Sequence, residues 1–201
     1  EIQEIEGWEK TLKSIYDLDH TTKKMFISGS NAFLLREELS SLLVGRFASF
    51  EVYPFSFAEF LRKYKLIIAH ENELIKHHQK LSRHLVEYLS YGGLPEVVLE
   101  ENISRKEELL RFYFDSMVFR DVIKRHKIRN PDKLTKLTEW CLQNVAVPVN
   151  FTRLGEYTGL NVDSVGEYTY YLEQAYLMFV INLFAYSLKK QYVNPKKIIC
   201  C

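Results

Sequence analysis

The chain has 201 residues, of which 47% are hydrophobic and 26% are charged, as is ordinary for a soluble globular protein. The formal net charge of +1 excludes a strong overall attraction to nucleic acid or to an anionic membrane, although local charged patches remain open. The three cysteines form no CxxC pair, which argues against a disulfide framework and a zinc site. The sequence has no signal peptide and no apolar run long enough to span a bilayer, so we expect a cytoplasmic protein.

The first third of the chain alternates between helix and strand patterns. Apolar residues at helical spacing predict a helix over 8–17, and a short apolar run predicts a buried strand over 25–27. A second helix is expected over 32–43, a second strand over 47–53, and a further helix to about residue 64. This alternation is typical of an α/β domain.

The sequence pattern predicts helices in the middle of the chain. Two capping boxes, Ser56 with Glu59 and Ser104 with Glu107, predict helix starts, and the second helix is expected to continue to about residue 124. Residues 70–90 are polar and helical in pattern.

The last third of the chain combines helix and strand patterns. Three further helices, beginning near residues 131, 151 and 162, are followed by two strands, over 178–183 and 192–200. Three helices followed by two strands is the order of a winged helix.

Small polar residues directly follow the predicted strand at 25–27. Ser28, Ser30 and Asn31 would stand at the carboxyl edge of the sheet, where ligands bind in open α/β sheets. A polar group at this place can orient the attacking water beside a γ-phosphate. The alternative is a tight turn in which Ser30 or Asn31 caps the next helix.

Taken together, several short patterns resemble one family. Residues 1–8 resemble the end of a Walker B strand and the helix after it, and residues 26–35 resemble the sensor strand of the same proteins. Further segments fit in the expected order: 43–46, 50–60, 91–96 and 119–122. The family is that of the prokaryotic, largely archaeal, AAA-type P-loop ATPases with an appended winged helix. The resemblance implies a mainly helical α/β fold: a remnant of the P-loop domain over 1–66, a helical lid-like region over 67–130, and a winged-helix-like domain over 131–201.

The resemblance also assigns roles to residues and implies ATP and Mg²⁺ as ligands of the parent protein. Glu1 would polarise the hydrolytic water, and Ser28, Ser30 or Asn31 would sense the γ-phosphate. Arg46 would be an arginine finger or would anchor its strand.

The sequence departs from the family at the phosphate-binding loop. A Walker A loop, GxxxxGK[ST], needs a Gly-Lys pair, and none occurs here. The Walker B aspartate would precede Glu1, and the chain starts without Met and stops in an apolar run, so both ends look cut. We therefore expect a fragment that carries the sensing part of an ATP site and gives no ATP turnover alone.

The competing hypothesis is a non-catalytic module that binds DNA or protein. The helix predicted over residues 162–174 carries acids and tyrosines but no Arg or Lys, which is unfavourable for insertion into a groove of duplex DNA. Lysines 189, 190, 196 and 197 could form a basic wing, or they could be ordinary solvated lysines. An exposed apolar sheet edge would favour homo-oligomers.

The remaining candidates favour structural roles. His70, His77, His78, His84 and His126 lack the spacing of a metal site, so we expect surface histidines and no metal. Cys141 lies on an apolar helix face and is expected to be a core thiol.

Overall fold

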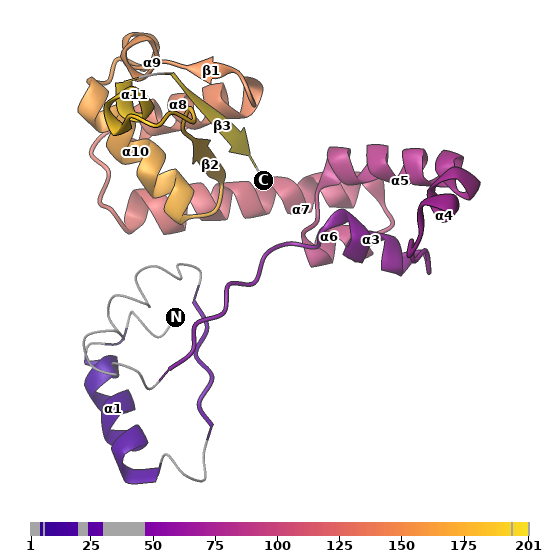
Figure 1. The fold of residues 1–201 in the computed structure, drawn as a ribbon. Helices are drawn as coiled ribbons and strands as arrows, with labels where there is room; N and C mark the ends of the chain where they lie inside the picture. The colour runs from indigo at the N-terminus through magenta and orange to yellow at the C-terminus, as the bar shows by residue number, and fades with distance from the viewer. Residues whose placement is uncertain (1–4, 6, 20–23, 30–46, 194, 201) are drawn as a thin grey trace. The chain divides into compact units, whose positions relative to one another are not determined.

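The computed structural model describes residues 5, 7–19, 24–29, 47–193 and 195–200 (Figure 1). The chain divides into two compact units, one formed by residues 52–119 and the other by residues 120–200 with residues 1–51. Helices dominate the described residues, and one three-stranded sheet accompanies them. The predicted mainly helical α/β class is confirmed at this level, whereas the three-part domain division stays a prediction.

The N-terminal segment contains one of the predicted helices. Helix α1 (Trp8–Asp19) buries Trp8 and Leu12, one turn apart on the predicted apolar face. The predicted strands over 25–27 and 47–53 are wrong, because neither segment pairs with another strand among the described residues. Phe26 is 92% exposed and Val52 is 94% exposed. A strand is held by a ladder of hydrogen bonds to a neighbour, which an apolar run alone does not supply. The helix predicted over 32–43 lies outside the described residues.

Residues 52–119 form a helical unit. Its helices are α3 (Phe57–Lys63), α4 (Glu71–Lys76), α5 (His78–Tyr91), α6 (Pro95–Leu99) and α7 (Ile103–Ser116). The core consists of Phe60, Leu61 and Val98, and half-buried aromatic side chains from α3 and α5 pack against it. Burial of these rings removes apolar area from water and holds α3 against α5.

One of the two predicted capping boxes starts a helix. The Ser56 hydroxyl accepts a hydrogen bond from the Glu59 amide at 3.3 Å, and the Glu59 carboxylate accepts one from the Ser56 amide at 2.9 Å, as predicted. The prediction that Ser104 and Glu107 form a capping box at a helix start is wrong, because α7 already begins at Ile103. Asn102 caps it by accepting a hydrogen bond from the amide of Arg105 at 3.2 Å. Asparagine is among the best N-cap residues, so it starts the helix before Ser104 is reached.

Two glycines close the turn after α5. Gly92 has a φ of +74°, and the Gly93 carbonyl accepts a hydrogen bond from the Phe55 amide at 2.7 Å. The Tyr88 hydroxyl donates to the Phe55 carbonyl at 2.7 Å. A Cβ on Gly93 would lie 2.1 Å from that carbonyl oxygen, so only glycine permits this approach of the two segments.

Residues 117–200 begin with a π-helix, Met117–Lys124, that continues directly from α7. The elements that follow are α8 (Pro131–Gln143), β1 (Pro148–Val149), α9 (Phe151–Thr158), α10 (Val162–Gln174), β2 (Met178–Ile181), α11 (Leu188–Val193) and β3 (Lys196–Cys200). The sheet is antiparallel with the order β1–β3–β2 (Figure 1). Within it, Ile181 lies opposite Lys197. The three expected helices and the first expected strand are present. The second expected strand is shorter than predicted, because residues 192–193 belong to α11 and β3 begins at Lys196, and β1 and α11 were not predicted.

The helices α8 and α10 bury their apolar faces with one face of the sheet. The side chains of Leu134, Leu137, Cys141, Val165, Leu172 and Ile198 are all 0% exposed. Asn161 caps α10 by accepting a hydrogen bond from the Ser164 amide at 2.7 Å. Gly159, with a φ of +71°, ends α9 in the left-handed conformation that is common after a helix.

Candidate functional site

Most of the predicted nucleotide-site residues lie outside the described residues. Glu1, Ser30, Asn31 and Arg46 belong to this group, and their roles stay predictions. Ser28 is described, and its side chain is exposed. No nucleotide site is therefore assembled from the part of the chain that the structure describes.

A buried charge cluster lies between α3, α5 and α7 in the helical unit. It consists of Tyr64, His84, Glu87 and Lys106, and we call it the Glu87 cluster. Lys106 is 4% exposed, and its Nζ donates a hydrogen bond to Glu87 Oε1 at 2.9 Å. The Tyr64 hydroxyl lies 2.9 Å from Oε2 and 3.1 Å from Oε1 of the same carboxylate. The His84 ring stacks on the Tyr64 ring with centroids 3.9 Å apart.

Burial and hydrogen bonds shift the pKa values of Glu87 and Tyr64 in the Glu87 cluster. Burial opposes ionisation of Glu87, but hydrogen bonds from Lys106 and Tyr64 outweigh it and lower the pKa of the carboxyl. Burial, together with the hydrogen bond to Glu87, raises the pKa of Tyr64 to about 12. Glu87 and Tyr64 therefore keep their charge states near neutral pH, and the hydrogen bonds that Glu87 accepts from Tyr64 and Lys106 join the three helices.

The segment Phe119-Arg120-Asp121-Val122, one of the family-like patterns, lies on the π-helix. Asp121 is 6% exposed, and its Oδ1 lies 3.4 Å from Arg120 Nε and 4.0 Å from an Arg125 nitrogen. Val122 is fully buried. The pattern therefore supplies a buried ion-paired carboxylate and a core valine, which is a structural role in this geometry.

Two of the predicted surface histidines pack on tyrosine rings. His84 stacks on Tyr64, and the His126 ring stacks on Tyr171 with centroids 3.7 Å apart and an angle of 11°. Burial, with the neighbouring Arg125 guanidinium, lowers the pKa of His126. The hydrogen bond that Tyr171 donates to Glu167 at 2.7 Å, together with burial, raises the pKa of the tyrosine to about 12. The prediction that His84 and His126 are surface residues is wrong, because a tyrosine from another element covers each imidazole ring. Helical spacing does not reveal contacts between different elements.

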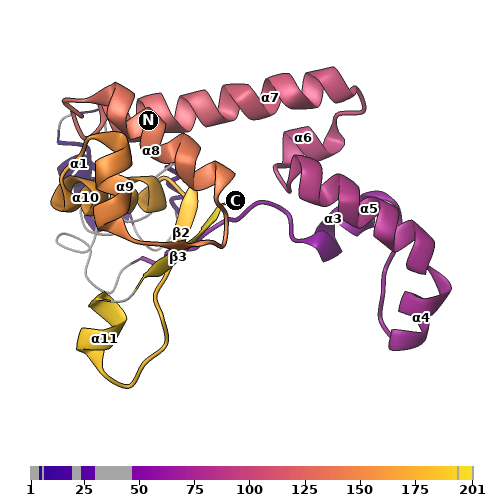
Figure 2. The ribbon, with the colours of Figure 1, turned by 90° about the horizontal axis from the view of Figure 1, so that it is seen from above.

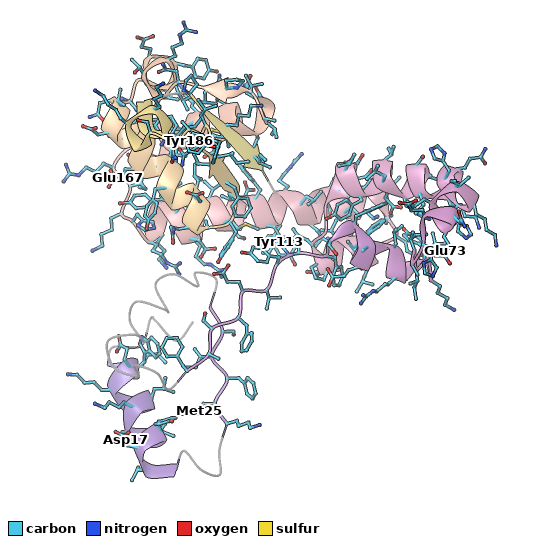
Figure 3. All side chains as sticks on the ribbon, in the orientation of Figure 1. Asp17, Met25, Glu73, Tyr113, Glu167 and Tyr186 are labelled. Atoms are coloured by element: carbon cyan, nitrogen blue, oxygen red, sulfur yellow. The ribbon has the colours of Figure 1, made fainter. Side chains whose placement is uncertain are left out.

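Opposite charges lie on different elements of the C-terminal part. Asp163 and Glu167 on α10 are exposed, and this helix carries no basic residue. Lys189 and Lys197 are exposed on α11 and β3. Figure 3 labels Glu167 on α10 and Tyr186 in the connection between β2 and β3. The acidic face and the basic segment are therefore built by different elements.

The described residues hold no group of three His, Cys, Asp or Glu side chains placed to bind a metal ion. Cys141 is fully buried, and burial raises the pKa of its thiol to about 12, which confirms the predicted core thiol. In the described part of the chain, no helix is both long and apolar enough to cross a bilayer.

Comparison with known proteins gives a family for most of the chain. Residues 82–201 match the family described as Domain of unknown function (DUF8612), which is more than half of the sequence. The chain belongs to the DUF8612 family. Residues 1–61 of this DUF8612 protein match an AAA domain, so this part is related to AAA-type ATPases. No solved structure matches the chain.

Two curated relatives cover nearly the whole sequence. The DUF8612 chain is 30% identical over 194 residues to the Uncharacterized protein MJ1544 of Methanocaldococcus jannaschii, which covers 94% of this chain. It is 31% identical over 184 residues to an Uncharacterized protein of Haemophilus influenzae, which covers 89% of this chain. In both cases the chain spans 43% of the relative's length.

Proposed function

We propose that this chain is part of an AAA-type ATPase whose phosphate-binding half is supplied by residues outside this sequence. The observation that carries the proposal is the match of residues 1–61 to an AAA domain. The absence of any Gly-Lys pair agrees with it, since a Walker A loop must then come from elsewhere. The parent protein would bind ATP with Mg²⁺ and hydrolyse it by attack of an activated water on the γ-phosphate. That the parent acts in the cytoplasm and self-associates also stays a prediction.

Within this proposal, the site residues have different roles in ATP hydrolysis. Glu1 activates the water, and Ser28, Ser30 or Asn31 contacts the γ-phosphate. Arg46 stabilises the charge that develops in the transition state. Catalysis by such sites rests on positioning and on electrostatic stabilisation, so a chain without the phosphate cradle should bind ATP poorly and turn it over no faster than background.

The test uses the longer protein encoded by the complete reading frame. The reading frame upstream of Glu1 should encode a GxxxxGK[ST] loop and an apolar strand that ends in Asp. In the purified longer protein, Glu1→Gln should abolish Mg²⁺-dependent ATP hydrolysis while retaining ATP binding. Glu101→Gln, a change at an exposed position in the helical unit, is the matched control and should keep full turnover. Mg²⁺-dependent hydrolysis by the 201-residue chain alone would contradict the proposed division of the site.

We further propose that residues 131–200 form a winged-helix module. Three helices and an antiparallel sheet in the order β1–β3–β2 support this assignment. The acidic face of α10 disfavours reading of a major groove, since carboxylates repel phosphates. We expect the 201-residue chain to show no salt-dependent binding to duplex DNA through α10, so Asp163→Asn with Glu167→Gln should not weaken duplex binding. Duplex binding that weakens when α10 is altered would contradict this proposal.

A further inference from the structure

The end of the sequence carries a strong local charge bias. After Glu173 the sequence has four lysines and no Asp or Glu, although the net charge of the whole chain is only +1. The preceding helix, α10, has three acids and no Lys or Arg. The C-terminal segment is therefore the basic part of an otherwise balanced chain, and polyanions would be attracted there.

Exposed aromatic side chains occupy the connection between β2 and β3, residues 182–195. Phe184 is 80% exposed and Tyr186 is 100% exposed. Their ring centroids lie 5.6 Å apart at an angle of 68°. The connection reaches away from the sheet together with α11 (Figure 2). Two exposed rings this close to each other offer flat faces on which other rings can stack.

Hydrogen bonds give this connection a defined shape. The side-chain amide of Gln191 donates to the Ala185 carbonyl at 2.6 Å, and the Gln191 amide donates to the Ser187 carbonyl at 3.1 Å. Ala185 lies between the two rings, so the contact from Gln191 fixes the backbone that carries both of them. A pre-shaped segment loses less conformational freedom when it binds a partner.

Lysines flank the aromatic pair. Lys189 and Lys190 are exposed in the first turn of α11, and Lys197 is exposed on β3 opposite Ile181. The fourth lysine, Lys196, has its Nζ 5.1 Å from the centre of the Phe151 ring, so it is engaged within the fold. Lys189 and Lys190 therefore follow the two rings within the same connection, and Lys197 lies at the end of that connection, opposite Ile181.

We propose that this aromatic and basic surface binds a single-stranded polynucleotide. Bases stack on Phe184 and Tyr186, and the phosphates lie against Lys189, Lys190 and Lys197. Base stacking on aromatic rings combined with a basic track is the physical basis of sequence-tolerant single-strand binding. In a duplex the faces of the bases are covered by their neighbours, so exposed rings have nothing to stack on. This proposal does not depend on the ATPase assignment.

The test measures fluorescence anisotropy of a labelled oligothymidylate of about 16 nucleotides with the purified 201-residue chain. We expect saturable binding that weakens as salt rises, and weaker binding to a duplex of the same length. Phe184→Ala and Tyr186→Ala should each weaken binding about fivefold or more. Lys189→Ala should reduce the slope of log affinity against log salt by about 0.7. An oligouridylate in a parallel titration distinguishes RNA from DNA as the strand that binds more tightly.

Matched controls come from the same unit. Tyr157 is 67% exposed on α9 and Lys136 is exposed on α8, so Tyr157→Ala and Lys136→Ala should leave binding unchanged. Circular dichroism establishes that every variant remains folded. The proposal is overturned if the chain binds no single strand at low salt, if the two aromatic variants bind like the unaltered chain, or if duplex binds as tightly as single strand. Binding confined to vesicles of anionic lipid would equally overturn it.

Discussion

Lys106 and Glu87 form a partly buried ion pair that joins α7 to α5. The Lys106 ammonium lies 2.9 Å from Glu87 Oε1 and 5.0 Å from the centre of the Tyr91 ring, and the lysine is 4% exposed. Almost the whole side chain is removed from water, so the charge depends on its partners. The adjacent Arg105 forms an ion pair of the same length with Glu108 at the surface, where the two side chains are 59% and 66% exposed. The two pairs differ chiefly in burial.

The first prediction uses these neighbouring pairs. Lys106→Ala should lower the free energy of unfolding by about 2 kcal/mol, because it leaves the partly buried Glu87 carboxylate without its ion-pair partner. This is less than the cost for a fully buried pair, since the Glu87 side chain keeps 28% exposure. Arg105→Ala should cost less than about 0.5 kcal/mol, because water screens its pair. Urea unfolding measures the free energy of unfolding of both variants. Equal losses of stability would show that burial does not make the Lys106 pair stronger than the Arg105 pair.

The second prediction concerns the stability of the chain at low pH. The pKa of Glu87 is lower in the folded chain than its ordinary value of 4.5. Its contribution to stability is therefore complete above that value and is lost as the pH falls through the lower, folded pKa. Glu87→Gln should cost stability at neutral pH and make the remaining stability less sensitive to acid below pH 4.5. Urea unfolding over a pH series measures this, with Glu108→Gln as the exposed control. If the stability of Glu87→Gln falls with decreasing pH as steeply as that of the unaltered chain, Glu87 does not contribute to the acid sensitivity.

The third prediction compares two glycines. Gly93→Ala should destabilise the chain by about 3 kcal/mol, because its Cβ would meet backbone atoms of Phe55, the oxygen at 2.1 Å. Gly166 lies inside α10, and the nearest atom to its added Cβ is a ring carbon of Phe151 at 4.0 Å. Gly166→Ala should therefore stabilise the chain by up to about 1 kcal/mol through helix propensity. Thermal unfolding should move in opposite directions for the two variants, and a tolerated Gly93→Ala would contradict the close approach.

The fourth prediction concerns the thiols. Burial raises the pKa of Cys141 to about 12, and the thiolate is the form that reacts with alkylating reagents. Iodoacetamide at about pH 8 should therefore leave Cys141 unmodified in the folded chain and modify it in urea. Cys200 is half-buried and should react before Cys141. Peptide mass spectrometry identifies the modified residue, and rapid labelling of Cys141 without denaturant would contradict its place in the core.

Local patterns alone predicted a large part of the helical structure. The spacing of apolar residues located α1, α8 and α10, and the box formed by Ser56 and Glu59 located the start of α3. These features depend on residues within one or two turns of each other, which a sequence displays directly. The fully buried Cys141 follows from the same periodicity.

Features that join distant segments were decided by the tertiary structure. Strand β1 has two residues and exists only because Pro148 and Val149 pair with β3, and residues 25–27 form no strand because an apolar run does not provide a partner. The ion pair between Lys106 and Glu87 bridges two helices through a gap of 19 residues, which no periodicity reveals. The sequence by itself therefore determined the helices, the family resemblance and the charge bias after Glu173. Only the tertiary structure decided which charges are buried and which aromatic rings remain exposed, because burial depends on packing between elements that are distant along the chain.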